Sequence, residues 1–479
     1  MYFHLNYVDT YSNTTSIPNG RHIWHFLWAK IFNLLSLENN QILLKAQIIH
    51  LVQTYIAFFS IYFFSKVLIR NTFLQISHIH IQYLSLWSTI IWFTIYATHS
   101  MHYHLVWNLW YSISYQITLP LFFYITALII ILCFEKVSSL KKIFFIFQIF
   151  LLSRFILQAH SMEFMYFLMY ISVLGILYIK ELFYIVKKYP LYTILGLTII
   201  SFMIKYFQPD SSKLFHYFNY ENFPHLYENI MTSGEKLIAG YNRASASINE
   251  LIYLNIFLGT IVLVIVIFNY IKHKQTTIMN VKMFLFLFFT SIFILIPLFQ
   301  FSSGLFAIIT KITAVNRLYF SSSIFMILPV SIYYFFRYTN KTSFKILPIN
   351  ITIFLILVSI WLYSNYTNGV NHNYYKNIKS LYNSFSPQKY AFNLSAKEIQ
   401  DVGKKIQYYE KKNTTKKTLY FYARDDISFV IKFIYRKNVL WHLRGNKNYI
   451  QSYNNDQNTS HVPILFESPL GFPQYIRYK

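Results

Sequence analysis

The sequence predicts an all-α polytopic membrane bundle of about ten helices, followed by a small α/β extracytoplasmic C-terminal domain. Of its 479 residues, 55% are hydrophobic and only 12% are charged, whereas a soluble protein carries about 25% charged residues. Lys and Arg number 42 and Asp and Glu 17, giving a net charge of +25. In a soluble domain this charge would indicate a nucleic-acid partner. Here it lies between long apolar runs, which favours loops that face anionic lipid and no nucleic-acid partner.

Apolar runs long enough to cross a bilayer, about twenty residues each, define the bundle. The predicted spans are residues 50–69, 78–98, 115–134, 143–158, 162–179, 191–207, 250–270, 283–300, 319–336 and 346–363. Only residues 158–161 separate the fourth span from the fifth. These two runs therefore either cross the membrane separately or form one re-entrant hairpin.

The connections between the spans alternate in basic charge. Lysines and arginines fill every odd connection: Lys66, Arg70, Lys136, Lys141, Lys142, Lys180, Lys187, Lys188, Lys272, Lys274, Lys282, Arg337, Lys341 and Lys345. In contrast, residues 99–114 and 158–161 contain neither Lys nor Arg. The positive-inside rule places the odd connections in the cytoplasm. We therefore expect an integral multi-pass protein of the plasma or inner membrane, with both termini outside the cell.

The N-terminal segment must then reach the outside. Residues 1–20 are polar and contain no signal peptide, so we expect a further helix upstream of this start; the alternative is that the first span itself translocates the segment. Apolar residues then recur at helical spacing over residues 21–37. This pattern predicts an amphipathic helix that lies on the outer membrane surface.

Polar residues that loop solubility does not require gather on the predicted outer side, so we place any chemistry there. They are Asp9, the loop histidines His99, His102 and His104, the pair His160 and Glu163 at a span entrance, Arg243 in the long loop 208–249, and Asn316 with Arg317 before the ninth span. Two interpretations fit Asp9: it is either a general base or metal ligand, or a solvated residue or helix cap. The three histidines are three and two positions apart, so one helix face would not carry all of them, and an aromatic interfacial belt is the better interpretation.

Charged side chains at the span ends are the stronger candidates. Glu163 lies three residues from His160, so both can share one helical face and could hold a cation; ordinary interfacial polarity is the alternative. Arg154 interrupts an apolar run, where an unpaired charge costs at least about 2.5–3.5 kcal/mol, so it pairs with a group such as a lipid phosphate or extends to the interface. The fork of Arg317 suits two phosphate oxygens, although an interfacial anchor is equally compatible.

The segment after the last span differs in composition from the rest. A capping box at Ser395–Glu398 predicts a polar helix towards Lys412, and a strand at 418–423, a helix at 425–435 and a strand at 438–441 follow. The single Cys133 excludes an intrachain disulfide. The domains are then a first outer segment at 1–49, a membrane domain at 50–365 and an outer α/β domain at 366–479.

This arrangement resembles the GT-C class of membrane glycosyltransferases. The resemblance rests on an acidic residue, Asp9, in a first outer segment, a surface helix at 21–37, many spans and an outer C-terminal domain. It implies transfer of a sugar from a polyprenyl-phosphate donor to an extracytoplasmic glycan, lipid or protein acceptor. Glu163 would match a second acidic site and Arg317 a residue that holds the lipid phosphate. In this class a helix precedes the first outer loop, and the sequence shows no such apolar run before Asp9; we expect that helix upstream.

The implied chemistry requires a base and a phosphate site. A carboxylate such as Asp9 would accept the proton of the acceptor, while Arg317 and Arg154 would stabilise charge on the leaving phosphate. A divalent metal held by Asp9, Glu163 or His160 is compatible but not required. The alternatives are a surface-polysaccharide polymerase or ligase, in which Arg243 would matter more, a transporter or flippase without chemistry, and a non-catalytic scaffold.

Overall fold

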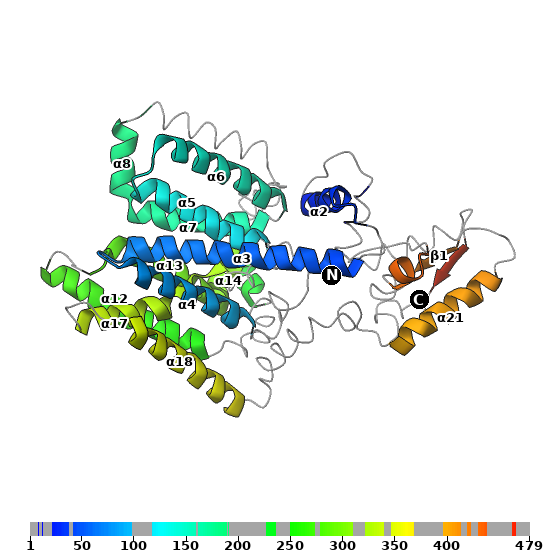
Figure 1. Cartoon of the computed structure of the whole chain (residues 1–479). Helices are drawn as coiled ribbons and strands as arrows, with labels where there is room; N and C mark the ends of the chain where they lie inside the picture. Colours follow the sequence, from blue (N-terminus) through cyan, green and yellow to red (C-terminus); the bar gives the residue numbers. More distant parts are fainter. Residues whose placement is uncertain are drawn as a thin grey trace. The chain divides into compact units, whose positions relative to one another are not determined.

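The computed structural model is helical, and its contacts divide the chain into two compact units (Figure 1). Unit 1 comprises Met1–Val52, Leu109–Tyr111 and Lys379–Lys479, and unit 2 comprises Gln53–Asn108 and Ser112–Ile378. The structure describes residues 8, 12, 22–37, 42–97, 117–159, 161–188, 190, 227–235, 250–273, 278–309, 321–339, 346–367, 396–412, 419–422, 430–437 and 462–465.

Unit 2 is a bundle of apolar helices that follow the predicted spans. Its helices are α3 (Ile42–Thr72, which begins in unit 1), α4 (His78–Ala97), α5 (Leu119–Phe134), α6 (Ser139–Ala159), α7 (Ser161–Leu177), α8 (Ile179–Lys188), α12 (Glu250–His273), α13 (Val281–Ile292), α14 (Gln300–Ile309), α17 (Ile327–Thr339) and α18 (Ile346–Thr367). The fourth and fifth spans are two separate helices, α6 and α7, packed against each other. The predicted span 191–207 lies outside the described residues.

Two helices in the described part of the chain, Gln47–Thr72 and Ile252–Lys272, are long and apolar enough to cross a membrane. A third candidate is the pair Val281–Ile296 and Gln300–Phe306, which bends by 97°. Shorter apolar helical stretches of 10–17 residues lie at Leu119–Phe134, Glu163–Leu177, Ile324–Thr339 and Ile346–Ile360. By length and composition, the chain therefore carries two or three candidate spans among its described residues.

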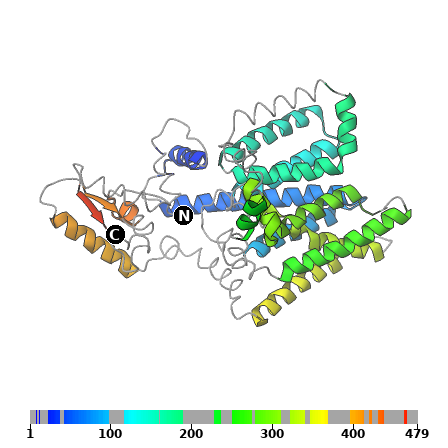
Figure 2. The ribbon, with the colours of Figure 1, turned by 180° about the vertical axis from the view of Figure 1, so that it is seen from behind.

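Aromatic side chains hold α3 between α4 and α5. The rings of Phe58 and Phe93 lie 6.2 Å apart between α3 and α4, and those of Phe63 and Tyr124 lie 5.2 Å apart between α3 and α5. Figures 1 and 2 show α3 running along the bundle with helices on either side. Since α3 is 31 residues long, it extends over about 46 Å at 1.5 Å per residue.

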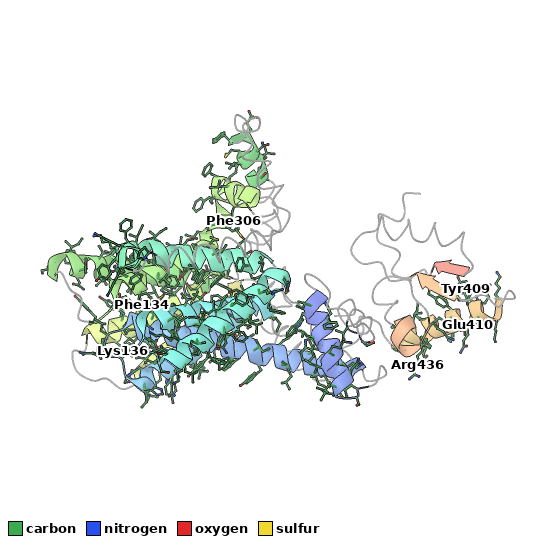
Figure 3. The ribbon with its side chains drawn as sticks, turned by 90° about the horizontal axis from the view of Figure 1, so that it is seen from above. Phe134, Lys136, Phe306, Tyr409, Glu410 and Arg436 are labelled. Carbon is green, nitrogen blue, oxygen red and sulfur yellow. The ribbon has the colours of Figure 1, made fainter. Side chains whose placement is uncertain are left out.

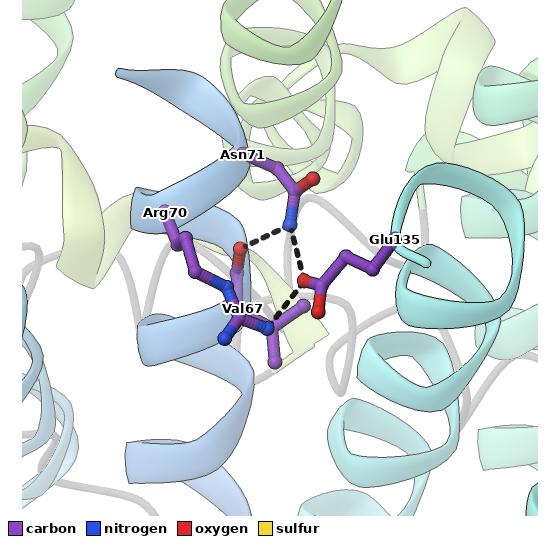
Figure 4. Close-up of polar contacts among 4 residues, drawn as sticks. All are labelled: Val67, Arg70, Asn71 and Glu135. Atoms are coloured by element: carbon purple, nitrogen blue, oxygen red, sulfur yellow. Dashed lines mark hydrogen bonds and ion pairs between the residues drawn. The ribbon is translucent and has the colours of Figure 1, made fainter. Parts of the chain in front are cut away.

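The five basic connections meet at one end of unit 2, here called the basic pole. Beyond α3, the backbone N–H of Leu74 donates to Ile278 O, which precedes α13. Arg70 also forms an ion pair with Glu135, and Asn71 Nδ2 donates to the same carboxylate oxygen at 2.9 Å (Figure 4). These contacts join the connections after α3, α5 and α12.

The connections after α7 and α17 join the same pole. Lys282, in the first turn of α13, pairs with Glu181 at the start of α8. The ring of Tyr333 in α17 lies 4.6 Å from that of Phe73, which follows α3. The alternation of charge in the sequence therefore corresponds to a real gathering of the odd connections at one end of the bundle. Which side of a membrane this end faces stays a prediction.

Two segments depart from the straight spans that the sequence predicts. Residues 283–300 were expected to form one helix, but α13 ends at Ile292 and a 3₁₀ segment, η3 (Phe293–Leu298), leads to α14. Pro297 falls in this segment, and proline cannot continue the helical hydrogen-bond ladder. Likewise α17 begins only at Ile327, after the 3₁₀ turn η4 (Ile324–Met326) and the non-helical Ser322 and Ser323.

Hydroxyl groups satisfy the backbone at the second break. Ser323 Oγ lies 2.5 Å from Thr290 Oγ1 and 3.2 Å from Ser291 Oγ of α13, and Ser322 Oγ donates to Ser291 O at 2.7 Å. Tyr170 Oη of α7 donates to Ser321 O at 2.6 Å. All these side chains are buried. Non-helical backbone at membrane depth needs such internal partners because lipid offers none.

Unit 1 contains the predicted surface helix and the predicted start of the C-terminal domain. Helix α2 (His22–Leu34) lies within the predicted helix 21–37, and its place on a membrane surface stays a prediction. Helix α21 (Ala396–Lys412) and strand β1 (Leu419–Tyr422) fall where a helix and a strand were expected, and the π-helical η5 (Val430–Ile434) lies within the predicted helix 425–435. Strand β1 pairs in parallel with β2 (Val462–Leu465), which the sequence did not predict; residues 438–441 lie outside the described ranges.

The interior of this C-terminal part is small. Val402 and Ile406 of α21 are buried, as are Phe421 of β1 and Val430 of η5, and Lys437 forms an ion pair with Glu410. Figure 3 shows Glu410 of α21 and Arg436 after η5 on these neighbouring elements. Gly403 permits the approach of η5, because a Cβ there would lie 2.4 Å from Tyr435 Oη.

Candidate functional site

Glu163 is the predicted site residue that the structure describes most clearly. It lies in the first turn of α7, and its side chain is 1% exposed. A carboxylate in the first turn of a helix is stabilised by the positive end of the helix dipole. The position lies at the end of unit 2 where α6 turns into α7, away from the basic connections. We call this end the opposite pole.

The helix turn that follows Glu163 on α7 carries a buried aromatic side chain that contacts α14. Tyr166, one turn further along α7, is also 1% exposed. Its ring stacks on Phe306 of α14, with centroids 6.5 Å apart and planes inclined by 18°. The bent pair of α13 and α14 therefore brings an aromatic side chain to the helix turn that carries the carboxylate. Because glutamate side chains are rarely fully buried in proteins, this position is a candidate functional site.

Arg154 has a different environment. It lies on α6, whose buried residues are Ser153, Ile156 and Ala159, and its own side chain is exposed. The apolar residues beside it on α6, such as Phe150 and Leu151, are exposed as well. On a surface that faces lipid, an arginine reaches the headgroup phosphates by extending its stem along the helix. Its position suits the lipid-phosphate contact that the sequence suggested, whereas Glu163 is enclosed by protein.

The opposite pole also includes a short helix, residues 227–235, from the predicted long outer loop 208–249. It packs on α14 through two glycines: a Cβ on Gly304 would lie 1.8 Å from Ile230 O, and one on Gly234 would lie 2.0 Å from Gln300 O. Gln300 Nε2 donates to Met231 O at 3.0 Å. Figure 3 shows α14, near the labelled Phe306, projecting from the bundle with this helix. Part of the long loop is therefore fixed to α14, whose Phe306 stacks on Tyr166.

Several predicted site residues lie outside the described residues. These are Asp9, His160, Arg243, Asn316 and Arg317, and the loop histidines at 99, 102 and 104. Among the positions that the structure does describe, no group of three His, Cys, Asp or Glu side chains could hold a metal ion. The metal set suggested for Asp9, Glu163 and His160 includes two undescribed members and stays a prediction.

The buried hydroxyl cluster around Ser323 was not singled out from the sequence. It comprises Tyr170, Thr290, Ser291, Ser322 and Ser323, and the neighbouring Asn255 Oδ1 accepts the N–H of Leu328 at 2.8 Å. Two signals could have indicated it: three consecutive serines in an apolar run and the proline that interrupts the preceding span. The identity of the partner helices could not be read from the sequence, since Tyr170 and Ser321 are 151 residues apart.

The chain was also compared with known proteins. No protein-family model, curated protein or solved structure matches it.

Proposed function

We propose that this protein is an integral membrane glycosyltransferase that moves a sugar from a polyprenyl-phosphate donor to an extracytoplasmic acceptor. The observation that carries the proposal is the enclosed carboxylate of Glu163, at the pole opposite the basic connections. If the positive-inside rule holds, that pole faces away from the cytoplasm. Lipid-linked sugar and the surrounding membrane lipid are then the partners.

In the reaction, the acceptor oxygen forms a bond to the anomeric carbon while the bond from that carbon to the donor phosphate breaks. The acceptor proton passes to a carboxylate, Asp9 or Glu163. The leaving phosphate keeps the bonding electrons, and a cation such as Arg317 or Arg154 stabilises the charge that develops on it. A donor with a polyprenyl tail requires a site at the membrane surface, and this pole would supply one.

The experiment is in vitro transfer with membranes that contain the full chain. Radiolabelled polyprenyl-phosphate hexoses and pentoses serve as donors, and envelope glycan serves as the acceptor. We expect Glu163→Gln to lower transfer by at least about a hundredfold, which is the usual contribution of an acid–base group. Glu235→Gln is the matched control, because Glu235 is an exposed carboxylate in the 227–235 helix.

Equal amounts of each variant must reach the membrane. Transfer by Glu163→Gln at the rate of the control would refute the role of this carboxylate. Two further variants are tested in the same assay. Asp9→Asn tests for a base in the first outer segment, and Arg317→Ala tests for a phosphate contact before α17. Absence of transfer by the unaltered protein with every donor would remove the proposal as a whole.

A transporter or flippase is the second candidate, and one observation favours it. Two helices are broken inside the bundle, and the break at Ser322–Ser323 is lined with hydroxyl groups. Transporters bind substrates at discontinuous helices of this kind. In proteoliposomes, movement of a fluorescent polyprenyl-phosphate lipid between leaflets without sugar transfer would select this function over the first.

A further inference from the structure

We propose that helix α8 is a membrane-interface anchor that binds the headgroups of anionic phospholipids at the basic pole. The inference depends on the chain spanning a membrane and not on the sugar-transfer chemistry. It is carried by the exposed face of α8, where apolar and basic side chains occur together.

The position of α8 fits the boundary of a bilayer. Only Tyr178 separates it from the end of α7 at Leu177. Figures 1 and 2 both show α8 crossing the ends of α6 and α7 rather than continuing along them. Glu181, in its first turn, is tied to Lys282 of α13 by an ion pair. A helix that is fixed to the end of a spanning bundle and runs across it lies at headgroup depth.

The apolar side chains of α8 would be unfavourable in water. Ile179, Phe183 and Tyr184 are 60%, 73% and 66% exposed, although α8 is only 10 residues long. Burial of a phenylalanine or isoleucine side chain away from water is favourable. The acyl boundary of a membrane would provide that burial, as it does for amphipathic interfacial helices.

The lysines of α8 keep the helix out of the hydrocarbon core and favour lipids with anionic headgroups. Lys180, Lys187 and Lys188 are all exposed, and Lys188 lies over the Tyr184 ring at 5.9 Å. Residues 180, 184 and 187 recur every three or four positions, so they share one face. Each lysine near an anionic surface contributes a factor of about five in binding. The only acidic residue of α8, Glu181, is already paired with Lys282.

The basic surface continues beyond α8. Lys136, which precedes α6, and Lys141 and Lys142 in the first turn of α6 are exposed at the same pole. They belong to the start of a helix that runs along the bundle beside α5 and α7 and not to α8. These three lysines therefore provide a control with the same loss of charge outside α8.

A nitroxide label on α8 tests the proposal directly. Cys133 is the only cysteine in the sequence, so Cys133→Ser with Phe183→Cys permits one label on the full chain. The protein is reconstituted in vesicles of phosphatidylglycerol or of phosphatidylcholine. We expect the label in phosphatidylglycerol to collide more often with membrane-soluble oxygen than with a water-soluble nickel chelate. In phosphatidylcholine the preference for oxygen should be weaker.

Charge variants of the labelled protein complete the test. Replacement of Lys180, Lys187 and Lys188 by Gln should shift the equilibrium towards water by about a hundredfold, from about fivefold for each lysine. Replacement of the same lysines by Arg keeps the charge, so the label at position 183 should stay in the membrane. This result would show that a helix with three substitutions still folds. The Gln control at 136, 141 and 142 should have a much smaller effect. A label that meets the nickel chelate equally in both lipids, is shielded from both reagents, or responds equally to both Gln variants would overturn the proposal.

Discussion

The glycine contact between α14 and the 227–235 helix makes a substitution at Gly304 informative. An alanine Cβ at this position would lie 1.8 Å from Ile230 O, whereas real Cβ atoms essentially never lie within 3.0 Å of such a neighbour. The neighbour is backbone and cannot rotate away. Gly304→Ala therefore requires the two helices to separate by at least 3.0 − 1.8 = 1.2 Å.

The cost of this separation follows from the contacts that it breaks. The hydrogen bond from Gln300 Nε2 to Met231 O, 3.0 Å long, would stretch beyond hydrogen-bonding distance and lose about 1 kcal/mol. Overpacking adds about 1–3 kcal/mol, and the better helix propensity of alanine returns about 1 kcal/mol. We expect a net loss of about 1–3 kcal/mol in the docking of the 227–235 helix on α14.

The assay measures the docking and the stability of the purified full chain. In a Cys133→Ser background, nitroxides at exposed Thr232 and Phe301 report the distance between the helices by pulsed electron resonance. Gly304→Ala should lengthen and broaden this distance and lower the unfolding temperature. Gly259→Ala is the matched control, because its Cβ would meet side-chain atoms and no backbone: Ile327 Cγ2 at 3.0 Å and the Phe288 ring at 3.5 Å. A distance distribution and unfolding temperature for Gly304→Ala that equal those of the control would refute the reasoning.

Three further substitutions test the bundle. Tyr170→Phe keeps the buried ring but removes the hydroxyl that donates to Ser321 O. The free energy of unfolding in denaturant should therefore fall by about 1–3 kcal/mol, whereas Tyr170→Ala should lower it by about 3–5 kcal/mol. Glu135→Gln removes a partly exposed ion pair and should cost less than about 1 kcal/mol; a larger loss, or one that 1 M salt does not reduce, contradicts this. The Lys282 ammonium holds the pKa of Glu181 below its usual range. Its stabilisation is therefore present above the unfolded pKa and is lost as the pH falls, so wild type and Lys282→Gln should differ in unfolding temperature at pH 7 and converge in acid.

The sequence predicted where helices form because apolar runs are a local property, although only two or three of the described helices are long and apolar enough to count as candidate spans. The runs at 78–98 and 346–363, for example, correspond closely to α4 and α18. It also indicated which connections meet, since lysine and arginine avoid the apolar interior and collect at one pole. The break at Phe293–Leu298 was missed because a search for apolar runs gave no weight to Pro297 within one.

Partners far apart in the chain could not be predicted. Edge-to-face ring contacts place Tyr170 beside Phe122 and Phe286, with centroids 5.1 and 5.7 Å away, but their sequence positions do not indicate these contacts. The same is true of the parallel pairing of β1 with Val462–Leu465. Such contacts depend on the packing of whole elements, to which the composition of any one segment contributes little.

The candidate site illustrates the difference between identifying a residue and knowing its surroundings. Sequence spacing selected both Glu163 and Arg154, yet one is 1% exposed and the other lies on an open helix face. Because an enclosed ionised carboxylate needs partners, a purely structural Glu163 would lose stability in Glu163→Gln together with any loss of transfer. A carboxylate that takes a proton from the acceptor would instead lose transfer while the unfolding temperature stays near that of the unaltered protein. Measuring both quantities on the same variant therefore separates a structural glutamate from a catalytic one.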